Sequence, residues 1–123
     1  MRIESYKDLK VYQLAYQLAM EIFEQTKSFP KEEKYSLIDQ MRRSSRSVCT
    51  SIAEAWRKRR YPKYFTNKLT DADAEGSETQ VWIDFSSSCK YINAEIYKYW
   101  TQGYEEIGKM LNGMLKQPEK FCQ

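Results

Sequence analysis

The basic residues in the middle of the sequence are the side chains whose type and spacing best favour a chemical role. Residues 42–68 hold nine Lys or Arg residues and one acid, Glu54, so this window has a net charge of +8. The other residues include 11 basic and 16 acidic ones, a net charge of −5. The net charge of the whole chain, +3, therefore hides a strongly basic window. Such an uneven distribution of charge favours an anionic partner.

Within this window, the run from Arg57 to Arg60 is the clearest candidate for nucleic-acid binding. Guanidinium groups bind phosphate oxygens in pairs and stack on bases, and tyrosine rings stack on unpaired bases. The alternative is a solvated helix end, whose cations would complement the helix dipole. The candidate nucleic-acid-binding residues are Arg57, Lys58, Arg59, Arg60, Tyr61, Lys63, Tyr64 and Lys68.

A second group of basic residues has acidic candidates as partners. Three acids recur at i, i+4 and i+7, a spacing that places them on one face of a helix. If the chain reverses near residue 61, that face lies opposite the arginines at residues 42–46. The sequence therefore predicts structural ion pairs within the set Arg42, Arg43, Arg46, Asp71, Glu75 and Glu78.

Residue types also disfavour enzymatic chemistry. The chain has no His, which excludes Ser-His-Asp and Cys-His catalysis and His-ligated zinc. Its three Cys form no C-x-x-C motif, so we expect neither a disulfide framework nor a thiolate metal site, and we expect a reducing, cytoplasmic environment. Glu54 and the acidic trio resemble a magnesium cluster, but the facing arginines would compete with the metal ion. We expect a non-enzymatic protein with no metal and no cofactor.

Apolar spacing predicts four helices that position these groups. Only 4 Gly and 3 Pro interrupt 123 residues, which favours long helices over a loop-rich β fold. The predicted helices cover residues 9–27, 33–60, 62–91 and 93–116, with a loose tail over residues 117–123. Short connections predict an all-α, antiparallel, up-down-up-down four-helix bundle, with residues 1–123 as a single domain. The polar start of the chain shows no signal peptide or membrane span, so we expect no membrane association.

The predicted helix over residues 62–91 carries two apolar sides. Phe65, Leu69, Ala72, Gly76, Thr79, Ile83 and Ser86 follow a heptad pattern suited to a bundle core. Val81, Trp82, Phe85 and Cys89 occupy the opposite side. The helix over residues 9–27 is likewise apolar over more than half of its circumference. The excess apolar surface indicates an additional interface with another subunit.

Several sequence strings, taken in order, carry a family resemblance. They are SYKDL at residues 5–9, FPKEEKY at 29–35, QMRRSS at 40–45, SIAEAWRKRRY at 51–61, KLTDA at 68–72 and ETQVWIDF at 78–85. In this order and spacing, the chain resembles the bacterial four-helix-bundle family that is encoded in intervening sequences of 23S ribosomal RNA genes. The resemblance spans roughly residues 5–115. Lys90 stands where that family often has Gly.

The resemblance implies a bundle that assembles as a homopentameric ring and associates with RNA. A related branch, the accessory variability protein of diversity-generating retroelements, is a basic pentamer that binds nucleic acid and a reverse transcriptase. We therefore expect a self-assembling protein that binds RNA or another nucleic acid through a basic surface repeated around a ring. The alternative is a protein–protein interaction scaffold or adaptor that binds no nucleic acid.

Overall fold

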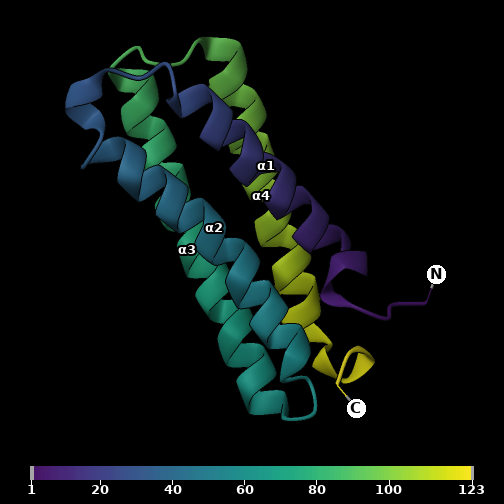
Figure 1. The fold of residues 1–123 in the computed structure, drawn as a ribbon. Helices are drawn as coiled ribbons and strands as arrows, with labels where there is room; N and C mark the ends of the chain where they lie inside the picture. Colours follow the sequence, from purple (N-terminus) through teal and green to yellow (C-terminus); the bar gives the residue numbers. More distant parts are fainter. Residues whose placement is uncertain (1, 123) are drawn as a thin grey trace.

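Four long helices make up most of the fold of residues 2–122, the part of the chain that the computed structural model describes (Figure 1). They are α1 (Lys10–Thr26), α2 (Leu37–Arg57), α3 (Pro62–Ser88) and α4 (Ala94–Lys116). Three short 3-10 turns, η1 (Tyr6–Asp8), η2 (Lys31–Glu33) and η3 (Pro118–Lys120), flank them. The described residues contain no strand, in agreement with the predicted all-α class. No helix among them combines the length and the apolar character needed to cross a membrane.

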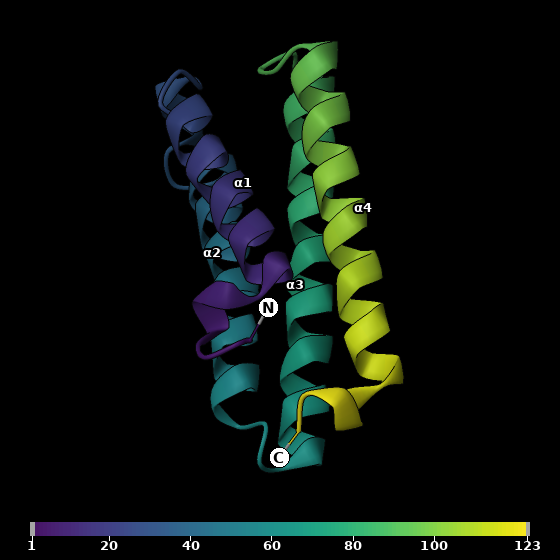
Figure 2. The same ribbon diagram turned by 90° about the vertical axis from the view of Figure 1, so that its right-hand side faces the viewer.

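Consecutive helices run in opposite directions and form a bundle (Figure 1). The helix pairs in contact are α1 with α2, α2 with α3, α3 with α4, and α4 with α1. Figure 2 shows the pair α1 and α2 beside the pair α3 and α4. Each helix therefore has two neighbours, and its remaining surface faces outward.

The bundle core is built from the apolar stripes of all four helices. Leu18 of α1, Met41 and Ile52 of α2, and Ile107 of α4 are almost completely buried. All seven positions of the heptad predicted for α3 are buried, from Phe65 to Ser86. The heptad spacing thus identifies the side of α3 that packs into the bundle.

The start of α2 differs from the prediction, because residues 31–33 form a 3-10 turn and the α-helix begins only at Leu37. The carboxylate of Glu33 accepts hydrogen bonds from the Ser36 hydroxyl at 2.7 Å and from the Tyr91 hydroxyl at 2.9 Å. The Phe29 ring also packs against Tyr91, with 5.2 Å between ring centroids. The two contacts with Tyr91, which lies in the α3–α4 connection, stabilise the 3-10 turn ahead of α2.

Helix α3 ends at Ser88, three residues before the predicted end. Lys90 has a φ of 63°, the left-handed conformation that terminates many helices. The amide of Lys90 donates to the Ser87 carbonyl, and the amide of Tyr91 donates to the Ser86 carbonyl, each at 2.9 Å. This is a Schellman motif, in which Gly usually occupies the position that Lys90 has here. The motif explains why Gly is common at this position in the family that the sequence resembles.

In place of the predicted loose tail, the residues after α4 fold back onto the bundle. Residues 118–120 form η3, and the amide of Cys122 donates to the Pro118 carbonyl at 2.9 Å. The Phe121 ring stacks on the buried Phe65 ring, with 6.1 Å between centroids. The apolar contact explains why this segment is ordered; residue 123 lies outside the described residues.

Candidate nucleic-acid interface

The basic run lies in the tight turn between α2 and α3. Helix α2 ends at Arg57, three residues earlier than predicted, so Lys58, Arg59 and Arg60 lie in the turn. The amide of Tyr61 donates to the Lys58 carbonyl at 2.9 Å, and Pro62 begins α3, where its missing N–H costs no hydrogen bond. The turn therefore spreads the four cations around the end of the bundle instead of aligning them on one helix face.

Arg59 differs from its neighbours because it is fixed to the end of α2. Its Nη1 donates to the Trp56 carbonyl at 2.9 Å, and its guanidinium carbon lies 4.0 Å from the centroid of the Trp56 ring. The contacts satisfy a terminal carbonyl and add a cation–π interaction. Arg59 thus has a structural role that Arg57 and Arg60, which are both exposed, do not have.

Two tyrosines stand beside this turn with more than half of their surface exposed. Tyr61 is 55% and Tyr64 is 56% exposed, and their rings meet edge to face at 6.2 Å between centroids. Lys58 Nζ lies 5.0 Å from the centroid of the Tyr64 ring. Exposed aromatic rings next to cations are the elements that bind single-stranded nucleic acid. We call Arg57, Lys58, Arg60, Tyr61, Lys63 and Tyr64 the turn cluster.

Lys68 has carboxylate partners, unlike the members of the turn cluster. Its Nζ lies 3.5 Å from Glu54 Oε1 and 3.9 Å from Asp71 Oδ2. Both acids therefore offset its charge locally. Within residues 2–122, the cations of the turn cluster form no such ion pair.

The ion pairs predicted for the first arginine group are not formed within residues 2–122. Arg42 Nε donates to Thr26 Oγ1 at 2.9 Å, and its guanidinium lies 4.7 Å from the centroid of the Phe23 ring. Arg46 also lies over that ring, at 5.6 Å. Both arginines therefore face α1 instead of α3. The Phe23 ring attracts their guanidinium groups through cation–π interactions, and the last turn of α1 accepts hydrogen bonds from Arg42. Arg43 is exposed and donates to Gln40 Oε1 at 3.4 Å.

The acidic trio Asp71, Glu75 and Glu78 stays on α3, facing none of these arginines at ion-pair distance. Burial raises the pKa of the Glu75 carboxyl above its usual value, and the neighbouring Glu78 raises it further. The charge of Arg43 acts in the opposite direction, so its field reaches Glu75 without direct contact. Within residues 2–122, no group of three or more acidic or thiol side chains is arranged to hold a metal ion.

A second basic surface lies along the first half of α2 and the residues just before it; the sequence predicts ion pairs for its arginines and does not single out Lys34 or Tyr35. A groove of about 500 Å³ there is lined by Lys34, Tyr35, Ile38, Asp39, Arg42, Arg43, Arg46, Ser47 and Thr50. Tyr35 is 85% exposed. We call Lys34, Tyr35, Arg42, Arg43 and Arg46 the groove cluster. The signal in the sequence is an aromatic residue next to a cation, Tyr35 after Lys34, the same combination of residue types as in the turn cluster.

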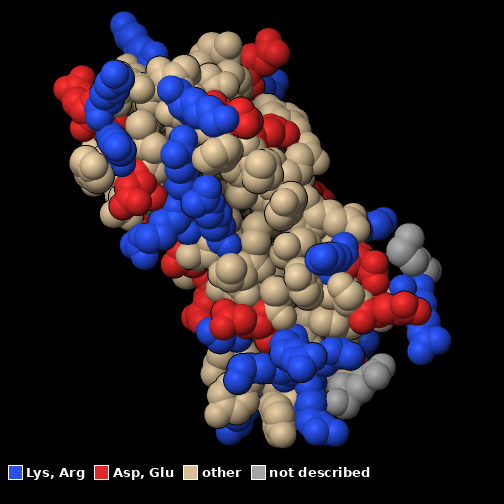
Figure 3. All heavy atoms as spheres, in the orientation of Figure 1, with Lys and Arg blue, Asp and Glu red and all other residues tan. Residues whose placement is uncertain are grey.

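The two clusters lie on the same face of the molecule (Figure 3). Blue atoms gather over the upper part of α2 and again around the α2–α3 turn at the lower end, with acidic and uncharged atoms between them. Arg46 and Arg57 are separated by about 16 Å along the helix axis, from the 1.5 Å rise per residue. The face therefore offers two separate sites for negative charge.

Comparisons with known proteins agree with the fold. A solved structure of a protein of unknown function from the S23 ribosomal protein family of Bacteroides thetaiotaomicron superimposes with a TM-score of 0.77. The two chains are 29% identical, and the match covers 86% of this chain and 95% of that chain. No curated protein matches the chain.

The sequence also matches a family model. The model describes the 23S rRNA-intervening sequence protein, and the match covers residues 7–113, which is most of the chain. The expected resemblance is thereby confirmed, and the four-helix fold agrees with it. The chain belongs to the family of 23S rRNA-intervening sequence proteins.

Proposed function

We propose that this protein binds single-stranded RNA through the face formed by the turn cluster and the groove cluster. The observation that carries the proposal is the set of eight cations on this face that have no carboxylate partner within residues 2–122. Unpaired Lys and Arg side chains release counterions when they bind phosphates, which gives affinity without sequence preference. Three exposed tyrosines beside them favour unpaired bases over a duplex.

The proposal includes self-association into a ring, with the pentamer as the expected size. Two apolar surfaces on different helices support it. One is a groove of about 580 Å³ between α1 and α4 that includes the exposed Tyr16, Met20 and Tyr99. The other lies on α3, where Val81 is 47% and Phe85 is 52% exposed. Contacts between two different surfaces of one chain are head-to-tail and close into a ring when the rotation allows. A ring would repeat the basic face and add avidity.

The test is a titration of the protein into labelled single-stranded fragments of 23S ribosomal RNA, followed by fluorescence anisotropy at several salt concentrations. The variant R57Q/K58Q/R60Q removes three cations of the turn cluster and spares Arg59, which has a structural role. For a single strand, the slope of log K against log salt should decrease by about two, at roughly 0.7 per contact.

A matched control removes the same charge elsewhere. Lys98, Lys109 and Lys116 are exposed on α4, and the variant K98Q/K109Q/K116Q should retain the affinity and the salt slope of the unchanged protein. Equal losses in both variants would mean that net charge alone drives binding and would contradict the proposed face. If the unchanged protein fails to bind RNA or DNA at low salt, the nucleic-acid function is wrong, and an adaptor that docks proteins through its apolar surfaces becomes the better explanation.

A further inference from the structure

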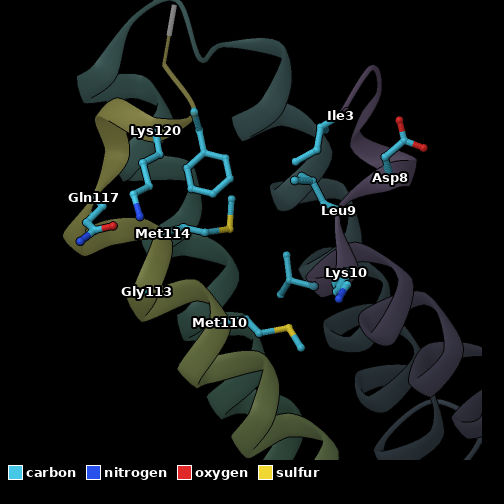
Figure 4. A pocket seen from close by; sticks show the side chains of 11 residues that line it. Ile3, Asp8, Leu9, Lys10, Met110, Gly113, Met114, Gln117 and Lys120 are labelled. Carbon is cyan, nitrogen blue, oxygen red and sulfur yellow. The ribbon is translucent and has the colours of Figure 1, made fainter. Parts of the chain in front are cut away.

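An apolar cavity of about 600 Å³ lies between the two ends of the chain (Figure 4). It shares no lining residue with the groove cluster. Ile3 and Leu9 come from the first segment, and Met110 and Met114 of α4 face them across the cavity in Figure 4. Val11 and Phe121 complete the apolar lining. The volume is within the range of small-molecule sites, which are mostly apolar with a few polar groups.

Basic side chains border this apolar cavity. Lys10 and Lys120 line it, and neither forms an ion pair within residues 2–122. Asp8, the one acid that lines the cavity in the described part of the chain, accepts hydrogen bonds from the amides of Glu4 at 2.9 Å and Ser5 at 3.1 Å. The Asp8 carboxylate caps η1 and points away from the cavity in Figure 4.

A second, polar cavity of about 490 Å³ adjoins the apolar one. The two share Ile3, Lys120 and Phe121 as lining residues. The polar cavity adds Arg2 and Arg59, and Glu4 is its one acid among residues 2–122. Arg59 is already held in place by the Trp56 carbonyl and ring. An apolar chamber therefore opens beside a group of cations, one of which has a fixed position.

We propose that the two cavities together bind one single-chain amphiphile with an acidic head, of the fatty-acid class. The alkyl chain lies between Leu9, Met110 and Met114, and the carboxylate lies beside Lys120 and Arg59. Methionine side chains adapt to a flexible alkyl chain, and a carboxylate forms charge-assisted hydrogen bonds with lysine and arginine. The site is distinct from the RNA-binding clusters and does not depend on the function proposed for them.

The test is isothermal titration calorimetry with laurate below its micelle concentration. Gly113 lines the apolar cavity, and a Cβ added there meets no atom within 4 Å, so G113L fills the cavity without a clash at the helix. Because Gly is a poor helix residue, this change should not unfold α4. The matched control is N112L, since Asn112 is exposed and lines a different cavity between α3 and α4.

We expect saturable binding of laurate that N112L retains and G113L abolishes. K120Q should weaken binding about tenfold through the loss of one charge-assisted bond, whereas K116Q should not. The neutral 1-dodecanol should bind about tenfold more weakly than laurate for the same reason. Absence of saturable binding, equal binding by G113L, or equal affinity for the alcohol would overturn the proposal. So would pelleting with phosphatidylglycerol vesicles that G113L leaves unchanged, because it would indicate adsorption to a membrane surface.

Discussion

Arg59 covers the indole of Trp56 at the end of α2, with 4.0 Å from its guanidinium carbon to the ring centroid and 2.9 Å from its Nη1 to the Trp56 carbonyl. Trp56 itself is buried in the bundle core. The four cations at residues 57–60 therefore have two different roles. Arg59 caps the end of α2, whereas the other three side chains remain exposed to solvent. Stability and nucleic-acid affinity should respond differently to changes within the same run.

Replacing Arg59 by Gln should lower the free energy of unfolding by about 1 to 2 kcal/mol, because a helix-terminal hydrogen bond and a cation–π contact are lost. Replacing Arg57 or Arg60 by Gln should change it by less than about 0.5 kcal/mol, as is usual for exposed side chains. Urea denaturation followed by circular dichroism measures these differences. Equal effects at all three positions would contradict the structural role of Arg59.

The tyrosines of the turn cluster should distinguish single strands from duplexes. Changing Tyr61 or Tyr64 to Leu keeps an apolar side chain but removes the stacking surface, so affinity for a single strand should fall by about 1 to 3 kcal/mol per base that stacks. Affinity for a duplex of the same sequence should stay nearly constant, because paired bases are not accessible to these rings. Anisotropy titrations with both RNAs measure the contrast, and a parallel loss for both would argue against stacking.

The sequence predicts the core better than it predicts the helix ends. The heptad from Phe65 to Ser86 is visible because burial recurs with the period of the helix itself. The start of α2 depends instead on Tyr91, which lies 58 residues from Glu33 and donates to its carboxylate. Such a contact exists only after the chain has folded, so local spacing cannot reveal it.

The candidate site shows the same limit. Charge counting locates the basic window, because side-chain charge is a property of the sequence alone. The sequence cannot show whether the guanidinium of Arg42 turns toward α1 or toward α3. The helical spacing of the acidic trio predicts α3, but the guanidinium lies against Phe23 and Thr26 of α1. The structure thereby assigns three arginines to an open groove that the sequence assigns to internal ion pairs.

The left-handed conformation of Lys90 predicts a stabilising substitution. A residue with a Cβ is strained at a φ of 63°, whereas Gly adopts it freely. K90G should therefore raise the free energy of unfolding by about 1 kcal/mol and the Tm by a few degrees. The control K98G, at an exposed position inside α4, should lower stability by about 1 kcal/mol. Differential scanning calorimetry measures the Tm of both variants. A lower Tm in K90G would mean that the backbone of Lys90 is not strained.

The apolar surface on α3 predicts the effect of one added charge on assembly. Phe85 is 52% exposed and its ring lies 6.0 Å from the ring of Trp82, whose buried indole Nε1 has no partner within residues 2–122. F85E should leave the helical signal unchanged but convert the proposed oligomer into a monomer of 14.7 kDa, because the proposed interface would bury the carboxylate unpaired. Light scattering coupled to gel filtration measures the mass. The control D84N, at the neighbouring exposed position, should keep the oligomer; a monomeric unchanged protein would contradict self-association.

The buried thiol of Cys49 predicts how stability depends on alkaline pH. Burial raises the pKa of this thiol from about 9 to about 11, and its Sγ lies 3.8 Å from the Ser45 carbonyl, to which it donates. In the unfolded chain the thiol ionises near pH 9, so between pH 9 and 11 the unfolded state binds fewer protons than the folded state. Stability should therefore fall as the pH rises through this range, by up to about 2 to 3 kcal/mol.

The variant C49A isolates this contribution. It lacks the thiol, so its stability relative to the unchanged protein should improve steadily from pH 8 to pH 11. Tyr12 and Tyr104 titrate in both proteins, and their pKa values are raised mainly by burial, so most of their effect cancels in the comparison. Urea denaturation at each pH measures the difference between the two proteins. A difference that stays constant across this range would mean that Cys49 ionises as readily in the folded protein as in water, and that the core around it admits solvent.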